Sequence, residues 1–176
     1  KGKSRDRIGD GAMGEAYVEY VRAIQDYCIE RGRTTQMWGD IIGKHPDKWG
    51  RLDPNTTVLH WGYDDNADYD ATKALVDAGV RTFVCPGTSG FKRIIHAIGL
   101  AERNIDRFAR TGMAHGATGL INTDWGDHGH FAPPACSLHG IALGAAKGWT
   151  ADHPISSAFD QRFVVHVLGG ADPVGV

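Results

Sequence analysis

The chain has 176 residues and a mass of 19.0 kDa, with 41% hydrophobic and 23% charged residues, which is typical of one globular domain and not of a disordered segment. Its net charge of −2 gives no basic footprint for nucleic acid, and no apolar run reaches the ~18 residues of a membrane span. Three distant cysteines indicate neither a disulfide framework nor a zinc ribbon. No apolar run follows the basic first residues, so the sequence slightly favours the cytoplasm without determining the compartment.

Hydrophobic periodicity predicts an alternation of helices and strands along the chain. In the first helix, Tyr17, Val21, Ile24 and Cys28 recur at spacings of three and four residues. The predicted helices cover residues 14–31, 68–78, 91–113 and 134–149. The predicted strands cover residues 35–42, 56–61, 81–85 and 119–123.

This order indicates an α/β fold, because strands that alternate with helices are joined by crossovers and run parallel. A helix followed by four strand–helix units predicts the C-terminal half of a (β/α)8 TIM-type barrel, whose full length is ~250 residues. A small open α/β sheet is the alternative. Residues 1–150 are expected to form the partial barrel with its last four strands, and residues 151–176 a C-terminal extension.

Three of the four strand ends carry a tryptophan near a glycine and a carboxylate. The segments are Trp38-Gly39-Asp40, Trp61-Gly62-Tyr63-Asp64 and Trp125-Gly126-Asp127. Because parallel strands present their carboxyl ends at one edge, we expect the three indoles to line one pocket rimmed by carboxylates. Such a pocket suits a sugar, whose C–H face packs on aromatic rings and whose hydroxyls bond carboxylates. Trp49 and Trp149 are predicted to have structural roles.

Other chemistries have weaker support in the sequence. Asp124, Asp127, His128 and His130 are suitable ligand types for a metal-dependent hydrolase, but their spacing matches no specific zinc motif. Thr88-Ser89 lies in a glycine-rich turn that lacks both the Gly-x-Ser-x-Gly elbow and the phosphate-loop spacing. Cys85 is predicted to be a buried packing residue. The sugar-binding interpretation needs no metal or cofactor.

The segment 119–130 reads GLINTDWGDHGH and precedes a helix of small residues. It resembles the last strand and helix of the catalytic barrel of glycoside hydrolase family 20, the β-N-acetylhexosaminidases. Three further segments resemble the preceding strands of that family in the same order: residues 37–42 (MWGDII), 58–61 (VLHW) and 83–89 (FVCPGTS).

The resemblance implies a (β/α)8 barrel that hydrolyses terminal β-linked N-acetylhexosamine from glycans. The family's mechanism is retaining and substrate-assisted, with the 2-acetamido oxygen as nucleophile and an Asp-Glu pair that orients it and supplies the acid. This chain contains no Asp-Glu dipeptide. The pair is therefore expected upstream of Lys1, and the chain alone is expected to be inactive.

The resemblance also assigns substrate-binding residues. Trp38, Trp61 and Trp125 match pocket-wall tryptophans, and Asp40 follows the first of these. Asp127 stands where the family has a glutamate that bonds sugar hydroxyls, and its shorter side chain leaves the sugar epimer open. Tyr63 is matched to the acetamido-binding tyrosine, although the family has that residue on its seventh strand. A non-catalytic carbohydrate-binding module and the metal-dependent hydrolase stay as rivals, and open sheet edges favour self-association.

Overall fold

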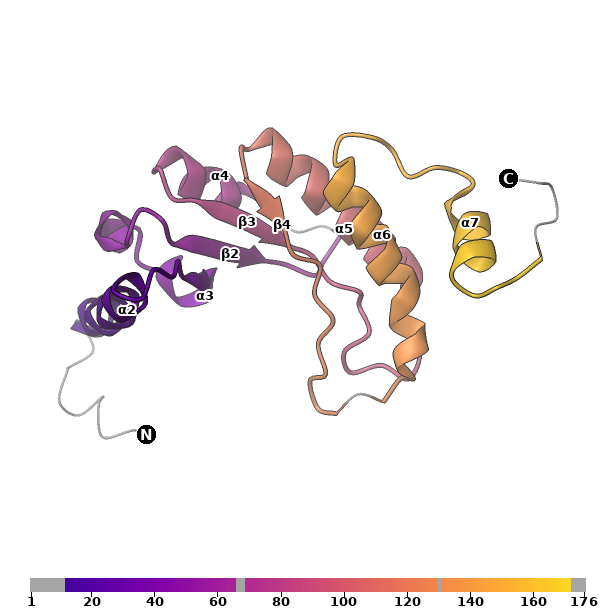
Figure 1. Cartoon of the computed structure of the whole chain (residues 1–176), viewed down its shortest axis with the longest axis horizontal. Helices are drawn as coiled ribbons and strands as arrows, with labels where there is room; N and C mark the ends of the chain where they lie inside the picture. Colours follow the sequence, from indigo (N-terminus) through magenta and orange to yellow (C-terminus); the bar gives the residue numbers. More distant parts are fainter. Residues whose placement is uncertain (1–11, 66–68, 130, 172–176) are drawn as a thin grey trace.

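A computed structural model describes residues 12–65, 69–129 and 131–171 of the chain, and in them it confirms an α/β fold (Figure 1). Four parallel strands form one sheet in the order β1-β2-β3-β4. The strands are β1 (Gln36–Trp38), β2 (Thr57–Trp61), β3 (Thr82–Cys85) and β4 (Gly119–Leu120). Helices alternate with them, as predicted.

The helices are α2 (Met13–Ile29), α3 (Gly39–Ile42), α4 (Asp70–Asp77), α5 (Ile98–Ala114), α6 (Leu138–Trp149) and α7 (Phe159–His166). Two 3-10 helices are η2 (Pro46–Arg51) and η3 (Pro134–Ser137). In the part of the chain that the structure covers, none of the helices has the length and hydropathy needed to cross a membrane.

Helices α2 and α4 pack on one face of the sheet. Val58 of β2 is fully buried in a cluster with Val18 of α2 and Leu75 of α4. His60 lies on the same face, two residues along the strand, and bonds Thr72 of α4. Val58 therefore packs both α2 and α4 against the same face of β2.

Helix α5 covers the same face next to β3. Val84 is the register partner of His60, and it is buried against Phe108 of α5. The Phe108 and His60 rings meet almost at right angles, with their centroids 5.3 Å apart. Side chains alternate between faces along a strand, so Trp38 and Trp61 point to the opposite face from these helices. Helices α2, α4 and α5 therefore cover one face of the sheet, and Trp38 and Trp61 lie on the other.

The first predicted strand, 35–42, is wrong in its second half, where residues 39–42 form the short helix α3. Gly39 crosses β2 so closely that a Cβ there would lie 3.1 Å from Val58 Cγ1. The turn lets Ile42 enter the core, and Trp49 Nε1 donates to the Ile42 carbonyl at 2.9 Å. The structural role of Trp49 is confirmed, whereas that of Trp149 is wrong because its ring is 89% exposed.

The predicted long helix begins at Ile98 and not at residue 91. His96 turns inward instead and is buried beneath Gly90, where a Cβ would lie 1.8 Å from His96 Nε2. Lys92 has a φ of +58°, which no helix accommodates. The segment 91–97 is therefore a loop that places Phe91 and Lys92 beside the carboxyl edge of the sheet.

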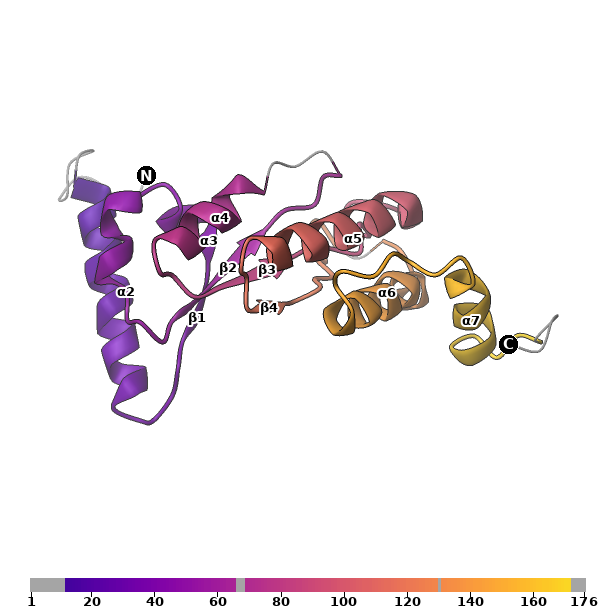
Figure 2. The same cartoon turned by 90° about the horizontal axis from the view of Figure 1, so that it is seen from above.

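The expected C-terminal extension holds α7. Phe159 of this helix packs on the cluster of Ala101, Ile105 and Leu143 that joins α5 to α6. Figure 2 shows α7 beyond α6, at the end of the molecule away from α2.

Candidate functional site

All six residues assigned from the sequence as substrate-binding line one cavity at the carboxyl edge of the sheet. The cavity measures about 310 Å³, within the range of small-molecule sites. Two residues that the sequence did not single out complete its lining. The full set is Trp38, Asp40, Trp61, Tyr63, Phe91, Lys92, Trp125 and Asp127.

Parallel pairing explains why residues so distant in sequence meet. Trp38 ends β1 and Trp61 ends β2, and the register aligns the carboxyl ends of successive strands. Beyond β4 the pairing continues through a bridge between Gly87 and Thr123, which carries Trp125 to the same edge. Each of the four strand ends therefore contributes a wall to one cavity.

Aromatic rings form a continuous wall in this cavity. Trp38 and Trp125 lie with ring centroids 5.2 Å apart and tilted by 51°. Trp61 stacks on Tyr63 at 5.2 Å, and Tyr63 contacts Phe91 at 5.4 Å. Trp38 and Trp61 keep 37% and 41% of their surface exposed, so their faces are available to a ligand.

Tyr63 connects the two halves of the aromatic wall. Its Oη accepts a hydrogen bond of 2.5 Å from Trp125 Nε1. Burial raises the pKa of the Tyr63 phenol, against the opposing effect of its hydrogen bonds with Thr123 and Trp125. The phenol thus stays neutral at physiological pH, and the wall carries no charge at its centre.

Three charged groups surround the rings. Asp40 projects from α3, whereas Lys92 and Asp127 come from the loops after β3 and β4. Two carboxylates and one ammonium can accept and donate hydrogen bonds to a ligand rich in hydroxyls. The site therefore combines an apolar surface with polar groups at its rim.

Asn104, buried on α5, fixes the two loops behind Tyr63, and it was not singled out in the sequence analysis. Its Oδ1 accepts from the Gly87 N–H at 3.0 Å, and its Nδ2 donates to the Gly62 carbonyl at 2.9 Å and to Tyr69 Oη at 3.1 Å. Helical spacing on α5 places Asn104 among the buried residues of that helix. Its hydrogen bonds to Gly62 and Gly87 join residues that are distant in sequence, and no local pattern predicts them.

Ser137, His96 and Asp124 lie close together behind the site, but their hydrogen bonds hold a loop in place and do not form a catalytic triad. Ser137 Oγ donates to Asp124 at 2.7 Å and lies 3.0 Å from His96 Nε2, and Thr88 Oγ1 donates to the same carboxylate at 2.5 Å. In a nucleophilic triad the carboxylate would bond the far imidazole nitrogen and not the serine. Ser137 and His96 are also buried, so no substrate reaches them. Asp124 thus holds the loop that presents Trp125.

The alternative metal site is not assembled among the residues that the structure describes. Asp124 accepts hydrogen bonds from Thr88 and Ser137. Among the described residues, the ligand atoms of Asp124, Asp127 and His128 do not lie within 4.8 Å of one another. His130 lies outside the described residues.

Cys85 is fully buried, as predicted, and burial raises the pKa of its thiol to about 12, which makes it a poor nucleophile.

Comparison with protein-family models and with curated proteins gives no match for this chain.

Proposed function

We propose that this chain binds a terminal N-acetylhexosamine of a glycan in the cavity of Trp38, Trp61 and Trp125. The observation that carries the proposal is the convergence of these three indoles, from three strand ends, on one cavity rimmed by Asp40 and Asp127. An aromatic face accepts the C–H side of a pyranose, and carboxylates accept its hydroxyls.

We further propose that the chain is the C-terminal half of a (β/α)8 barrel of the family-20 type. Two observations support this. Successive strands pair in sequential order, whereas a doubly wound sheet reverses its order at a switch point. Helices α2, α4 and α5 cover one face, and the tryptophans lie on the other, as they would on the inside of a barrel.

The proposed activity of the whole barrel is hydrolysis of terminal β-linked N-acetylhexosamine, with the acetamido oxygen of the substrate as nucleophile. The aromatic wall would hold the sugar, Asp127 would bond its hydroxyls, and Tyr63 would contact the acetamido group. The acid and its orienting aspartate belong to other strands of such a barrel. This chain by itself is proposed to bind the sugar without cleaving it.

Titration with methyl β-N-acetylglucosaminide, followed by tryptophan fluorescence and calorimetry, tests the proposal. Trp125→Ala and Asp127→Asn are expected to weaken binding at least tenfold. Trp149→Ala, at an exposed ring outside the cavity, is the matched control and is expected to bind as the original chain does. Methyl β-glucoside, which lacks the acetamido group, is expected to bind more weakly. Equal affinity for both glycosides, or none for either, would contradict the proposal.

A further inference from the structure

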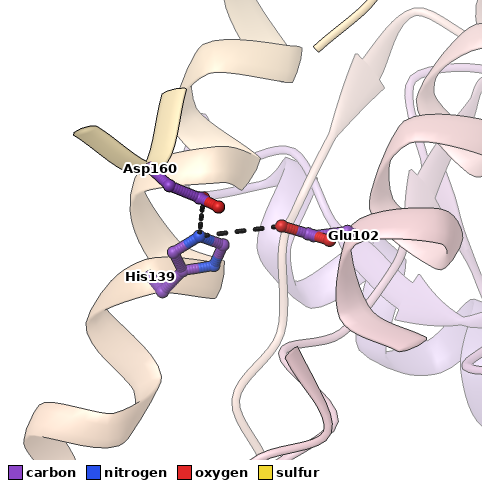
Figure 3. Close-up of side chains that lie close together, drawn as sticks. All are labelled: Glu102, His139 and Asp160. Carbon is purple, nitrogen blue, oxygen red and sulfur yellow. Dashed lines mark hydrogen bonds and ion pairs between the residues drawn. The ribbon is translucent and has the colours of Figure 1, made fainter. Parts of the chain in front are cut away.

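A second cluster of ligating side chains lies away from the cavity, between three helices. Glu102 on α5, His139 on α6 and Asp160 on α7 each offer one ligand atom, and these atoms all lie within 4.8 Å of one another. Figure 3 shows both carboxylates directed at the same imidazole nitrogen, Asp160 from above and Glu102 from the right. We propose that this cluster is a divalent-metal site, with zinc as its preferred ion, that fastens α7 to α5 and α6.

The spacing of the ligand atoms fits a tetrahedral ion. His139 Nε2 lies 2.8 Å from Asp160 Oδ1 and 3.8 Å from Glu102 Oε1. Zinc bonds of about 2.0–2.2 Å in tetrahedral geometry place ligand atoms roughly 3.3–3.6 Å apart. The two observed distances bracket that value, so small side-chain rotations would admit the ion. One imidazole and two carboxylates form a donor set that zinc accepts.

The imidazole is held in place before any ion arrives. His139 is buried, and the rings of Phe159 and Phe163 meet it edge-on at 5.3 and 5.1 Å between centroids. These contacts orient Nε2 toward the carboxylates and fix one ligand on a rigid helix. A preorganised ligand loses less conformational entropy on binding.

Charge at the cluster favours a cation. Two carboxylates face one imidazole, so the group is negative whether or not the ring is protonated. Among the described residues, neither Glu102 nor Asp160 forms an ion pair with a lysine or arginine. Lys147, on the same helix as His139, pairs instead with Asp106 at 2.8 Å. A divalent ion would balance this charge.

The place of the cluster suggests what the ion does. Helix α7 has no fully buried residue and follows a stretch without regular structure after α6. It is joined to the rest by Phe159 and by His139 itself. An ion held by one ligand from each helix would fix α7 in place, since it links the three elements through three strong bonds.

The test is calorimetric titration of the purified, EDTA-stripped 176-residue chain with zinc chloride, with magnesium chloride as the comparison ion. One zinc per chain is expected to bind, and magnesium is expected not to compete. Glu102→Gln and Asp160→Asn are each expected to weaken zinc binding at least tenfold, because even indirect contacts to a metal site cost 10–100-fold. Glu102→Gln keeps the His139–Asp160 hydrogen bond, so it separates a metal site from a simple docking bond.

Asp152→Asn is the matched control. Asp152 lies 3.9 Å from His153 in an exposed pair without a third ligand, and its loss is expected to leave zinc binding unchanged. Protease cleavage within residues 150–158 is expected to slow when zinc is added to the original chain, and not when it is added to Glu102→Gln. Equal zinc affinity in the original chain and in both ligand variants, which would place the ion on the free cysteines or elsewhere, overturns the proposal, as does the absence of binding.

Discussion

Replacing Asn104 by alanine tests whether one buried amide holds the loops of the cavity. The side chain is fully buried and joins the β2–α4 loop to the β3–α5 loop through Gly62 and Gly87. Alanine leaves the buried Gly87 N–H without its acceptor, which costs about 1–3 kcal/mol. The Gly62 carbonyl is half-buried and reaches water more easily, and a small void adds to the loss. We therefore expect Asn104→Ala to lower the free energy of unfolding by about 2–4 kcal/mol.

Urea denaturation followed by circular dichroism measures this quantity. Arg103→Ala is the matched control on the neighbouring position of the same helix, because Arg103 forms an exposed ion pair with Asp65 at 2.6 Å. Exposed pairs contribute about 0–1 kcal/mol, so this variant should stay close to the original chain. Asn104→Asp keeps an acceptor for Gly87 but turns a carboxylate toward the Gly62 carbonyl, and should be at least as damaging as alanine. Equal stabilities of Asn104→Ala and Arg103→Ala would refute the argument.

Three other outcomes are expected. Gly87→Ala would place a Cβ 2.9 Å from the Tyr63 ring and should weaken glycoside binding at least fivefold in fluorescence titrations, whereas Gly148→Ala, with no atom within 4 Å of the new Cβ, should not. Burial lowers the pKa of His60 below its usual value of 6.5, so the folded chain disfavours the protonated ring and its free energy of unfolding should fall as the pH drops below 6.5. Denaturation curves from pH 7.5 to 5 should show a smaller fall of this free energy in His60→Gln. The edge strands β1 and β4 should promote self-association, and a sedimentation coefficient that does not change with concentration would oppose this.

The strand ends could be predicted from the sequence because their signals are local. Short apolar runs such as residues 57–61 and 82–85 alternate with helical periods, and this alternation alone implies parallel pairing. Parallel pairing then places every carboxyl end at one edge. Trp38, Trp61 and Trp125 could therefore be grouped without knowledge of any long-range contact, and the structure brings them to one cavity.

The remaining parts of the site depend on contacts that no local pattern encodes. The apolar spacing of Ile94, Ile95 and Ile98 matched a helix from residue 91, yet burial of His96 beneath Gly90 held that segment in a loop. Ile94 and Ile95 are consequently 77% and 75% exposed, against what their hydrophobicity predicts. Phe91 and Lys92 line the cavity because the segment 91–97 forms a loop and not a helix.

Sugar binding and sugar cleavage need different groups, and only binding is proposed for this cavity. Binding needs aromatic faces and exposed hydrogen-bonding groups, and Asp40 and Asp127 are exposed at the rim of the indole wall. Cleavage needs a group that holds a proton at the leaving oxygen, which in carboxyl groups takes burial or a second carboxylate in contact. Behind the rim, Asp124 is instead tied to two hydroxyls. Release of a chromogenic leaving group from a β-N-acetylglucosaminide by this chain, abolished by Asp127→Asn, would contradict this separation and make Asp127 the acid.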